Sequence, residues 1–399
     1  MILSHFFSFF VTLILPLRTT SIPACTIDED CNLNGICYNN SCVCDPGWKS
    51  PDCGALDLVP APLKNGYNKT SIGTSSWGSK IIHRTPQSNI FDLFLAEFTH
   101  GCGLDYWSPY SRIIRAVSST GPVGPYESAD EVVGTFAHNP TVVYSQADEK
   151  YLMYYIGCPQ TVPETCTSPN FTCGPGNTIN GESGISVSSS PDLKTWTSHG
   201  QMLVGTDNGA WDADITNPSP FPLYSPDHPT GEIALAYRGC PYNCSGSELI
   251  NLATAASFLG PYHKTQTAPL FPNPAEDPFL WRDKRGNFHM LLHSLERGGG
   301  FGDGPKVGRH AFSRTLEGPW TVNERALAFD TRVEFEDGSE TRYFRRERPQ
   351  LFFSEEEYGE MEPLYLTTGV QEVGRRGSYS LIQPVRGAGC YERGLGVLR

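Results

Sequence analysis

The sequence contains little charge and has no block of basic residues. Lys, Arg, Asp and Glu make up 18% of its 399 residues, against about 25% in an average globular protein. The formal net charge is −13. A nucleic-acid-binding protein needs rows of Lys and Arg to displace counterions, and anionic membranes attract the same residues. The composition therefore excludes nucleic acid as a partner and disfavours an anionic membrane surface.

Long apolar runs are also missing, apart from one near the N-terminus between Phe6 and Leu15. This run is shorter than the roughly 18 residues that a membrane-spanning helix needs, but it matches the core of a secretory signal. We predict a signal peptide over residues 1–21. A short anchor is the alternative, because only His5 stands where a basic segment usually precedes the run. No later stretch is long enough, so we expect no membrane span after signal removal.

Cysteine, in contrast, is abundant. The chain has 13 cysteines, which is typical of proteins from oxidising compartments. It also carries four N-x-S/T sequons for N-glycosylation, at Asn39, Asn68, Asn170 and Asn243. Together these features predict a secreted, extracellular glycoprotein.

Six of the cysteines lie within a short N-terminal stretch, with the spacing C-x5-C-x5-C-x4-C-x-C-x8-C. So short a stretch cannot bury a sufficient apolar core and must be held by disulfides. Six cysteines allow fifteen pairings, and arithmetic alone does not choose among them. The six are Cys25, Cys31, Cys37, Cys42, Cys44 and Cys53.

This spacing, with Gly47 and Trp48 between the last two cysteines, resembles the EGF-like module. The resemblance implies a domain over residues 25–53 with the pairs Cys25–Cys37, Cys31–Cys42 and Cys44–Cys53. Calcium-binding modules of this kind carry acidic residues before the first cysteine, and residues 21–24 contain none. We therefore expect no calcium there. The module either binds an extracellular protein partner or serves as a spacer or cap.

The remaining cysteines are harder to pair. Cys166–Cys173 and Cys240–Cys244 are close in sequence and are predicted to form local disulfides. That leaves Cys102, Cys158 and Cys390. Because thirteen is odd, at least one cysteine must be free or paired between chains.

From residue 57 onward the sequence favours β-structure. No segment of ten residues has convincing helical periodicity, and short apolar runs bounded by turn residues recur instead. A second element, a Ser-rich or small-residue strand followed by a turn that ends on an aromatic residue, recurs as well. The closing aromatic residues are Tyr126, Trp196, Tyr262 and Trp320, which are 70, 66 and 58 residues apart.

A third element, usually X-Pro followed by a hydrophobic residue, precedes each apolar run. This three-part order occurs five times, and such a period indicates the blades of a propeller. A β-sandwich is the competing fold, but it gives no reason for the recurrence. We predict an all-β chain with a five-bladed β-propeller over residues 57–399. The expected blades are Ser75–Tyr126, Thr135–Trp196, Asp214–Tyr262, Pro274–Trp320 and Arg345–Pro384.

Polar residues gather where the first strand of each blade begins and the second ends. These positions meet beside the central channel of a propeller, and they would suit a polar ligand such as an oligo- or polysaccharide. Some of these side chains would merely cap strand ends. The predicted substrate-binding residues are His100, His138, Asn139, Asn217, Arg238, Glu276, His293 and Arg348, with Trp77 and Trp211 as flat faces for a sugar ring.

The repeated strand start and the Gly-Pro-aromatic turn resemble the five-bladed propeller glycoside hydrolases, which include arabinanases, levansucrases and invertases. The resemblance implies hydrolysis by axial carboxylates: a base or nucleophile in blade one, an auxiliary Asp in blade two and an acid Glu in blade three. One such carboxyl group must have a raised pKa while another stays ionised.

The sequence departs from that trio. Blade one has Ser75, Ser76 and Trp77 where the base should be, blade two has His138, and blade three shows no obvious acid Glu. The carboxylates concentrate instead in blades three to five. We take Asp214, Asp277 and Glu347 as the catalytic candidates.

Two functions follow from these residues. The first is a secreted glycoside hydrolase whose catalytic set has moved around the ring. The second is a non-catalytic extracellular protein that binds glycan at the propeller mouth and a protein through the EGF-like module. No cofactor is expected, although an acidic mouth would suit a structural Ca²⁺ ion on the axis. The glycine-rich segment at 296–304 lacks the Gly-Lys-Ser/Thr of a phosphate-binding loop and is expected to be a surface loop.

Overall fold

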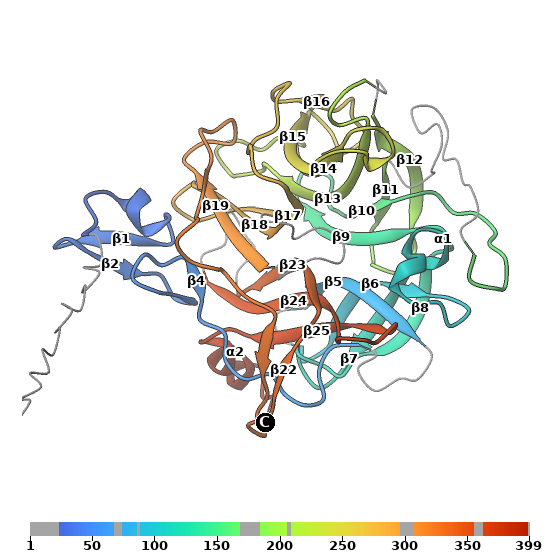
Figure 1. Cartoon of the computed structure of the whole chain (residues 1–399), viewed down its shortest axis with the longest axis horizontal. Helices are drawn as coiled ribbons and strands as arrows, with labels where there is room; N and C mark the ends of the chain where they lie inside the picture. The colour runs from blue at the N-terminus through green and yellow to red at the C-terminus, as the bar shows by residue number, and fades with distance from the viewer. Residues whose placement is uncertain are drawn as a thin grey trace, which may run out of the picture.

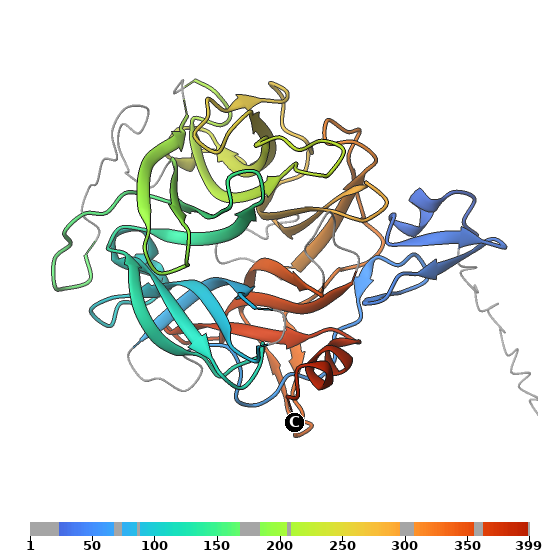
Figure 2. The same ribbon diagram turned by 180° about the vertical axis from the view of Figure 1, so that it is seen from behind.

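Five antiparallel sheets surround a common axis in the computed structural model, which describes residues 24–67, 74–85, 88–167, 184–205, 209–295, 307–354 and 362–397. Figure 1 shows the ring, and Figure 2 shows it from behind. The predicted all-β, five-bladed propeller is therefore confirmed. The predicted signal peptide, the sequons Asn68 and Asn170, Cys173 and the glycine-rich segment lie outside the described residues.

Each of the first four blades is a four-stranded meander, and the fifth has three strands. Blade one is formed by β5 (Ser75–His83), β6 (Phe91–Phe98), β7 (Ser111–Ser118) and β8 (Glu127–Val133). Blade two is formed by β9 (His138–Ser145), β10 (Lys150–Ile156), β11 (Ile185–Ser190) and β12 (Thr197–Leu203). Blade three is formed by β13 (Asp214–Pro222), β14 (Ile233–Cys240), β15 (Leu249–Ala255) and β16 (His263–Lys264).

Blades four and five follow the same order. Blade four is formed by β17 (Ala275–Arg282), β18 (Phe288–Ser294), β19 (Val307–Ser313) and β20 (Thr321–Val322), and blade five by β23 (Arg345–Phe353), β24 (Pro363–Gln371) and β25 (Ser378–Pro384). Between them lies a hairpin of β21 (Arg332–Glu334) and β22 (Glu340–Arg342). The first strands β5, β9, β13, β17 and β23 contact one another around the axis.

The hydrophobic core is divided among the interfaces between neighbouring blades. Each middle strand is covered on both faces, which is why the eight residues of β14 are all buried and read as a nearly continuous small and apolar run. Separate clusters fill the interfaces of blades one and two, two and three, three and four, four and five, and five and one. Stacking of the blades therefore supplies most of the apolar burial that holds the ring together.

The ring closes through the segment that follows the EGF-like module. Tyr67 pairs with Ser380 and Leu58 with Val385, so this segment runs beside β25 where the other blades have a fourth strand. Helix α2 (Ala388–Gly394) ends the described chain, and α1 (Trp107–Tyr110) lies in the loop between β6 and β7. None of the helices among the described residues is long and apolar enough to cross a membrane.

The N-terminal module consists of the short helix η1 (Asp28–Cys31) and two small hairpins, β1 (Gly35–Tyr38) with β2 (Ser41–Cys44), and β3 (Trp48–Lys49) with β4 (Ala55–Leu56). Its disulfides are Cys25–Cys37, Cys31–Cys42 and Cys44–Cys53, the pairing that the EGF-like resemblance implies. The sequon residue Asn39 is exposed on this module, and Asn243 is exposed on blade three.

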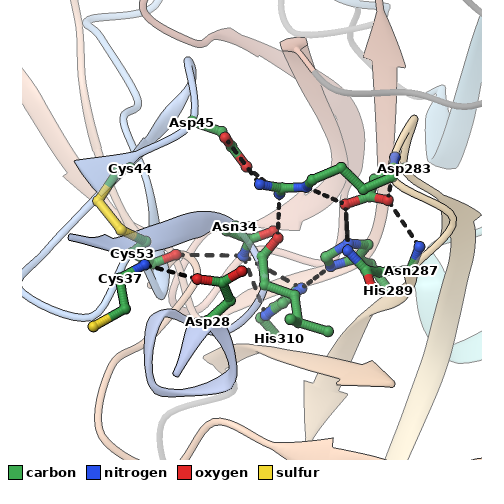
Figure 3. A network of polar contacts seen from close by, with 12 residues as sticks. Asp28, Asn34, Cys37, Cys44, Asp45, Cys53, Asp283, Asn287, His289 and His310 are labelled. Atoms are coloured by element: carbon green, nitrogen blue, oxygen red, sulfur yellow. Dashed lines mark hydrogen bonds and ion pairs between the residues drawn. A yellow bond between two sulfur atoms is a disulfide. The ribbon is translucent and has the colours of Figure 1, made fainter. Parts of the chain in front are cut away.

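The module protrudes from the rim of the propeller but is fixed to blade four by buried contacts (Figures 1 and 3). Trp48 joins the apolar cluster between blades four and five and stacks on Trp281, with ring centroids 6.4 Å apart. Asn34 donates to the buried His310 ring at 3.3 Å. This docking favours a cap over a freely tethered spacer.

Arg285, in the turn between β17 and β18, spans the same interface. It donates to the carbonyl of Leu33 at 2.6 Å and pairs with Asp45 of the module and Asp283 of its own blade. Burial raises the pKa of Asp45 despite the charge of Arg285. That carboxylate therefore depends on the arginine for its charge balance.

We expect Arg285→Ala to lower the free energy of unfolding by about 1–3 kcal/mol, because it removes the hydrogen bonds to Leu33, Asp45 and Asp283 at a partly buried interface. The unfolding midpoint in urea measures this. Arg375→Ala, at a side chain that is 74% exposed, is the matched control. A variant as stable as that control would contradict the proposed anchoring role of Arg285.

The cysteines outside the N-terminal module are paired differently from the prediction in one case. Cys166 is bonded to Cys102, so the predicted Cys166–Cys173 pair is wrong. This bridge joins the loop after β6 to the segment after β10, a long-range contact that sequence proximity could not indicate. Cys240–Cys244 is present as predicted. Cys158 is also disulfide-bonded, and Cys390 is free and exposed.

Candidate functional site

The axis is closed by one residue from each first strand, which together we call the axial ring. All five have left-handed backbone with φ between 52° and 55°. This conformation is open to glycine and tolerated by Asn and Asp, which explains most of the residue types present. The axial ring consists of Gly78, Asn139, Asn217, Asp277 and Arg348.

The side chains of the axial ring bind one another. Asn139 donates to Asn217 at 3.1 Å, and Asn217 donates to Asp277 at 2.8 Å. The backbone and guanidinium of Arg348 donate to the two oxygens of Asp277 at 2.9 and 3.1 Å, and Arg348 also reaches the carbonyl of Asn139 at 3.1 Å. Gly78 leaves the space that Arg348 fills. Asp277, taken from sequence as a catalytic candidate, thus has a structural role here.

A cavity of about 230 Å³ lies against the axial ring. The residue preceding the ring position in four of the blades lines it, namely Trp77, His138, Glu276 and Glu347. The loop between β6 and β7 adds three further residues to its wall. The complete lining is Trp77, Leu104, Asp105, Trp107, His138, Asn139, Asn217, Arg238, Glu276, Asp277, Arg345 and Glu347.

Glu276 and His293 form a buried ion pair at the cavity wall. His293 Nδ1 lies 3.0 Å from Glu276 Oε1. Burial disfavours the carboxylate, but the hydrogen bond and charge of His293 outweigh it and hold the pKa of Glu276 below its usual value. Burial likewise opposes the imidazolium, yet the charges of Glu347 and Glu276 raise the pKa of His293. Each group of the pair therefore favours the charged form of the other.

Glu248 stands beside this pair and behaves in the opposite way. It directly precedes β15, is buried, and hydrogen-bonds to Glu276. Burial and the negative charge of Glu276 raise its pKa, although the charge of Arg238 opposes the shift. Two adjacent carboxyl groups cannot both ionise without repulsion. The site therefore holds a protonated carboxyl next to an ionised one.

His138 is neutral in this environment. Burial and the positive charge of Arg348 lower its pKa well below the usual value, and its Nδ1 contacts Ser111 Oγ at 2.7 Å. The Trp107 ring lies over it, with centroids 4.7 Å apart. This part of the cavity offers a flat, uncharged face.

Most of the predicted site residues line the cavity, and five do not. His293 and Arg348 lie behind the lining, where they bond to Glu276 and Asp277. The other three lie farther away. Asp214 accepts a hydrogen bond from the backbone of Asn243 at 2.6 Å, beside the Cys240–Cys244 turn. His100 lines a separate open hollow of about 1000 Å³ above blade one. Trp211 donates its indole N–H to the Thr267 carbonyl and lies outside the cavity lining. The prediction that Asp214, His100 and Trp211 share one site with the other candidates is therefore wrong for this cavity, because none of the three lines it.

Four side chains could hold a cation between them. Glu276, Asp277, His293 and Glu347 each offer a ligand atom within 4.8 Å of the others. Both Asp277 oxygens already accept hydrogen bonds from Arg348, so a cation here would compete with a guanidinium. Calcium prefers six to eight oxygen ligands. The axial Ca²⁺ ion stays a prediction.

Comparison with known proteins covers both parts of the chain. Residues 27–55 match the Teneurin-like EGF domain family. No curated protein matches the chain. The propeller resembles Zg3597, a family 117 glycoside hydrolase from the marine bacterium Zobellia galactanivorans, with 14% identity, a TM-score of 0.54, and coverage of 83% of this chain and 90% of that one.

Two further solved structures have the same fold. The catalytic domain of a GH62 α-L-arabinofuranosidase from Coprinopsis cinerea is 10% identical, with a TM-score of 0.51 and coverage of 86% of this chain and 98% of that one. A thermostable family-43 glycoside hydrolase is 12% identical, with a TM-score of 0.51 and coverage of 80% and 96%. The chain thus shares the fold of five-bladed propeller glycoside hydrolases, as its repeat pattern predicted.

Proposed function

We propose that the chain is a glycoside hydrolase that cleaves O-glycosyl bonds of an oligo- or polysaccharide at the propeller mouth. One observation carries the proposal: the buried, hydrogen-bonded pair of Glu248 and Glu276, with pKa values shifted in opposite directions, next to Glu347. Glycoside hydrolysis needs one protonated and one ionised carboxyl group at the scissile bond.

In this proposal Glu248 is the general acid that protonates the leaving oxygen. Glu276 is the auxiliary carboxylate whose charge keeps Glu248 protonated, and Glu347 is the base or nucleophile. Glu347 lines the cavity from blade five, where Arg345 Nη1 lies 3.7 Å from its carboxylate. Glu248, just before the third strand of blade three, would then be the acid Glu that inspection of the sequence did not identify.

The remaining cavity residues are suited to bind the sugar. Trp77 and Trp107 are flat apolar surfaces in its lining, against which a pyranose ring packs well. Asn139 Oδ1, in the cavity lining, is buried and has no hydrogen-bond partner among the described residues. Such an atom is costly when unsatisfied, and a sugar hydroxyl group would satisfy it.

Incubation of the secreted protein with a panel of plant, algal and microbial glycans tests the proposal. Product release is followed by chromatography and binding by calorimetry. We expect turnover of at least one glycan, and its loss in the Glu248→Gln, Glu347→Gln double variant. Turnover that persists in the double variant would contradict the assignment of these residues.

The pH dependence of turnover tests the role of Glu276 separately. Because Glu248 must be protonated, turnover falls as the pH rises through its raised pKa. In Glu276→Gln one negative charge is gone, so the pKa of Glu248 decreases and the alkaline limb moves to lower pH. A limb that stays in place, measured as kcat against pH, would rule out this coupling.

A non-catalytic glycan-binding protein is the second candidate. Blades one and two place Trp77 and His138, rather than carboxylates, at the wall position, which favours binding without cleavage. The EGF-like hairpin also exposes Ile36, Tyr38 and Val43, which are 45%, 63% and 52% exposed, and these would serve a protein partner. Saturable glycan binding without product release in the same panel would favour this function.

The disulfide-rich module is typical of extracellular proteins, and we propose that the chain is secreted. Asn39 and Asn243 are exposed and open to glycosylation. A shift in electrophoretic mobility after enzymatic removal of N-glycans from the secreted protein would test both points.

A further inference from the structure

We propose that the buried pair His289 and His310 makes docking of the EGF-like module pH-dependent, and that a proton taken up by this pair loosens the module from the propeller. The two rings lie at the interface shown in Figure 3, between blade four and the module. Neither ring lines the sugar cavity. Release of the module by acid would thus be a property separate from the proposed sugar chemistry.

The two rings continue a chain of hydrogen bonds from blade four to the module. His289 Nε2 lies 3.3 Å from Asp283 Oδ2, and an ionised carboxylate only accepts, so this nitrogen carries a hydrogen. His289 Nδ1 lies 3.1 Å from His310 Nε2. On the module, Asn34 Nδ2 lies 3.3 and 3.4 Å from the two ring nitrogens of His310 and also reaches the Cys53 carbonyl at 3.3 Å.

The neutral pair satisfies every member of this chain. Two neutral imidazoles carry two N–H groups and two lone pairs on their four nitrogens. One N–H is donated to Asp283 and the other joins the two rings, so one lone pair is left to accept from Asn34. A third proton removes that lone pair, whichever ring receives it, because the last lone pair is used between the rings. Turning the Asn34 amide would only place its oxygen against the Cys53 carbonyl.

Burial acts in the same direction as the count of donors. The exposed fractions of His289 and His310 are 1% and 0%, so a charge on either ring loses its hydration. Burial and the charge of His289 lower the pKa of His310 well below its usual value. Trp48 of the module covers the His310 ring, with centroids 5.0 Å apart, and detachment would return this ring to water. The detached state therefore binds more protons than the docked state, and acid favours it.

The carboxylates around the pair do not produce this effect. Burial raises the pKa of Asp45, so the docked state holds that proton more tightly and acid favours docking through this group. Burial also disfavours ionised Asp283, but the hydrogen bond and charge of His289 outweigh it and lower the pKa of Asp283 to about 2. Arg285, which joins the two carboxylates, keeps its charge throughout. The interface further contains Asp52 of the module, the Glu29–Arg314 ion pair at the rim and the apolar Phe353 of blade five.

Hydrogen exchange of the full-length protein between about pH 7.5 and about pH 5 tests the proposal. The Leu56 amide donates to the Ala328 carbonyl across the interface at 3.0 Å, so it reports detachment of the module, whereas amides of β6 report opening of the propeller. The rates are corrected for intrinsic exchange. Below about pH 6.5, the ordinary pKa of histidine, we expect exchange of Leu56 to increase by up to about 10-fold per pH unit for one extra proton bound, and exchange of β6 to increase less.

Three variants assign the effect to the pair. In His310→Gln, exchange of Leu56 should be faster than in wild type at neutral pH but nearly independent of pH. Asn34→Asp places a carboxylate against the ring and should reverse the slope, because an imidazolium donates well to a carboxylate. His228→Gln, at a side chain of blade three that is 58% exposed, is the matched control and should keep the wild-type slope.

Two results would overturn the proposal. One is a Leu56 exchange rate that does not change with pH, or that rises only in parallel with β6. The other is a wild-type slope retained in both His310→Gln and Asn34→Asp, which would assign the proton to other groups. Should His310→Gln fail to fold, as judged by circular dichroism, Asn34→Asp and the comparison of Leu56 with β6 in the wild type still decide the question.

Discussion

Glu248→Gln is expected to reduce kcat by about 10²- to 10⁴-fold, the usual contribution of a general acid. Glutamine keeps the size of the side chain and its neutral state but cannot give up a proton. Because the protonated carboxyl already lacks charge, the substitution should leave the fold and KM nearly unchanged. Steady-state kinetics on the glycan identified by the panel measures the effect.

The leaving group distinguishes an acid from a merely structural residue. A nitrophenyl glycoside needs little protonation, so Glu248→Gln should regain much of its lost rate on that substrate. Glu347→Gln should lose turnover on both substrates, since the base or nucleophile is needed whatever the leaving group. Glu317→Gln, at an exposed position in blade four, serves as the control. Equal losses for Glu248→Gln on both substrates would exclude it as the acid.

The fold could be predicted because its signals are local and repeated. The first strand of every blade contains an axial-ring residue, which in four blades is Gly, Asn or Asp, and in four blades proline follows it, as in Asn217-Pro218 and Asp277-Pro278. The apolar middle strands recur in the same order, and the aromatic residues that close the turns recur every 58 to 70 residues. Such a pattern places the first strands around the axis, and in the structure Glu276 and Glu347 line one cavity while His293 pairs with Glu276 behind it.

The details of the site depended on contacts that no local pattern encodes. Glu248 precedes a third strand, and Trp107 lies in a loop that also carries one half of the Cys102–Cys166 bridge. Asp214 begins the correct strand, but it pairs with Cys240 and lies three residues before the axial-ring residue Asn217. Strand starts indicate which blade contributes a residue. They do not indicate how far from the axis its side chain lies.

Asp277→Ala is expected to have the largest effect on stability, a loss of about 3–5 kcal/mol, because it removes the one carboxylate bonded to the buried Arg348. It also removes the shorter of the two hydrogen bonds that the Asn217 amide donates, so one of the links between β13 and β17 is lost. Unfolding by urea measures the change. Arg386→Ala, at an exposed ion pair with Asp57, should change stability little.

The double variant Asp277→Asn, Arg348→Met decides whether Asp277→Ala loses stability because a buried charge is left unbalanced or because the hydrogen bonds of the axial ring are broken. If the loss in Asp277→Ala comes from an uncompensated guanidinium, removing both charges together should restore most of the stability. If the double variant is as unstable as Asp277→Ala, then the hydrogen bonds of the axial ring hold the blades together. In either case sugar binding should weaken, since Glu276 and Glu347 directly precede these two residues and depend on their backbone for position. A substitution of Asp277 should therefore lower both stability and sugar binding, as expected of a residue that supports the site. A substitution of Glu248 should lower kcat alone, as expected of a residue that performs the chemistry.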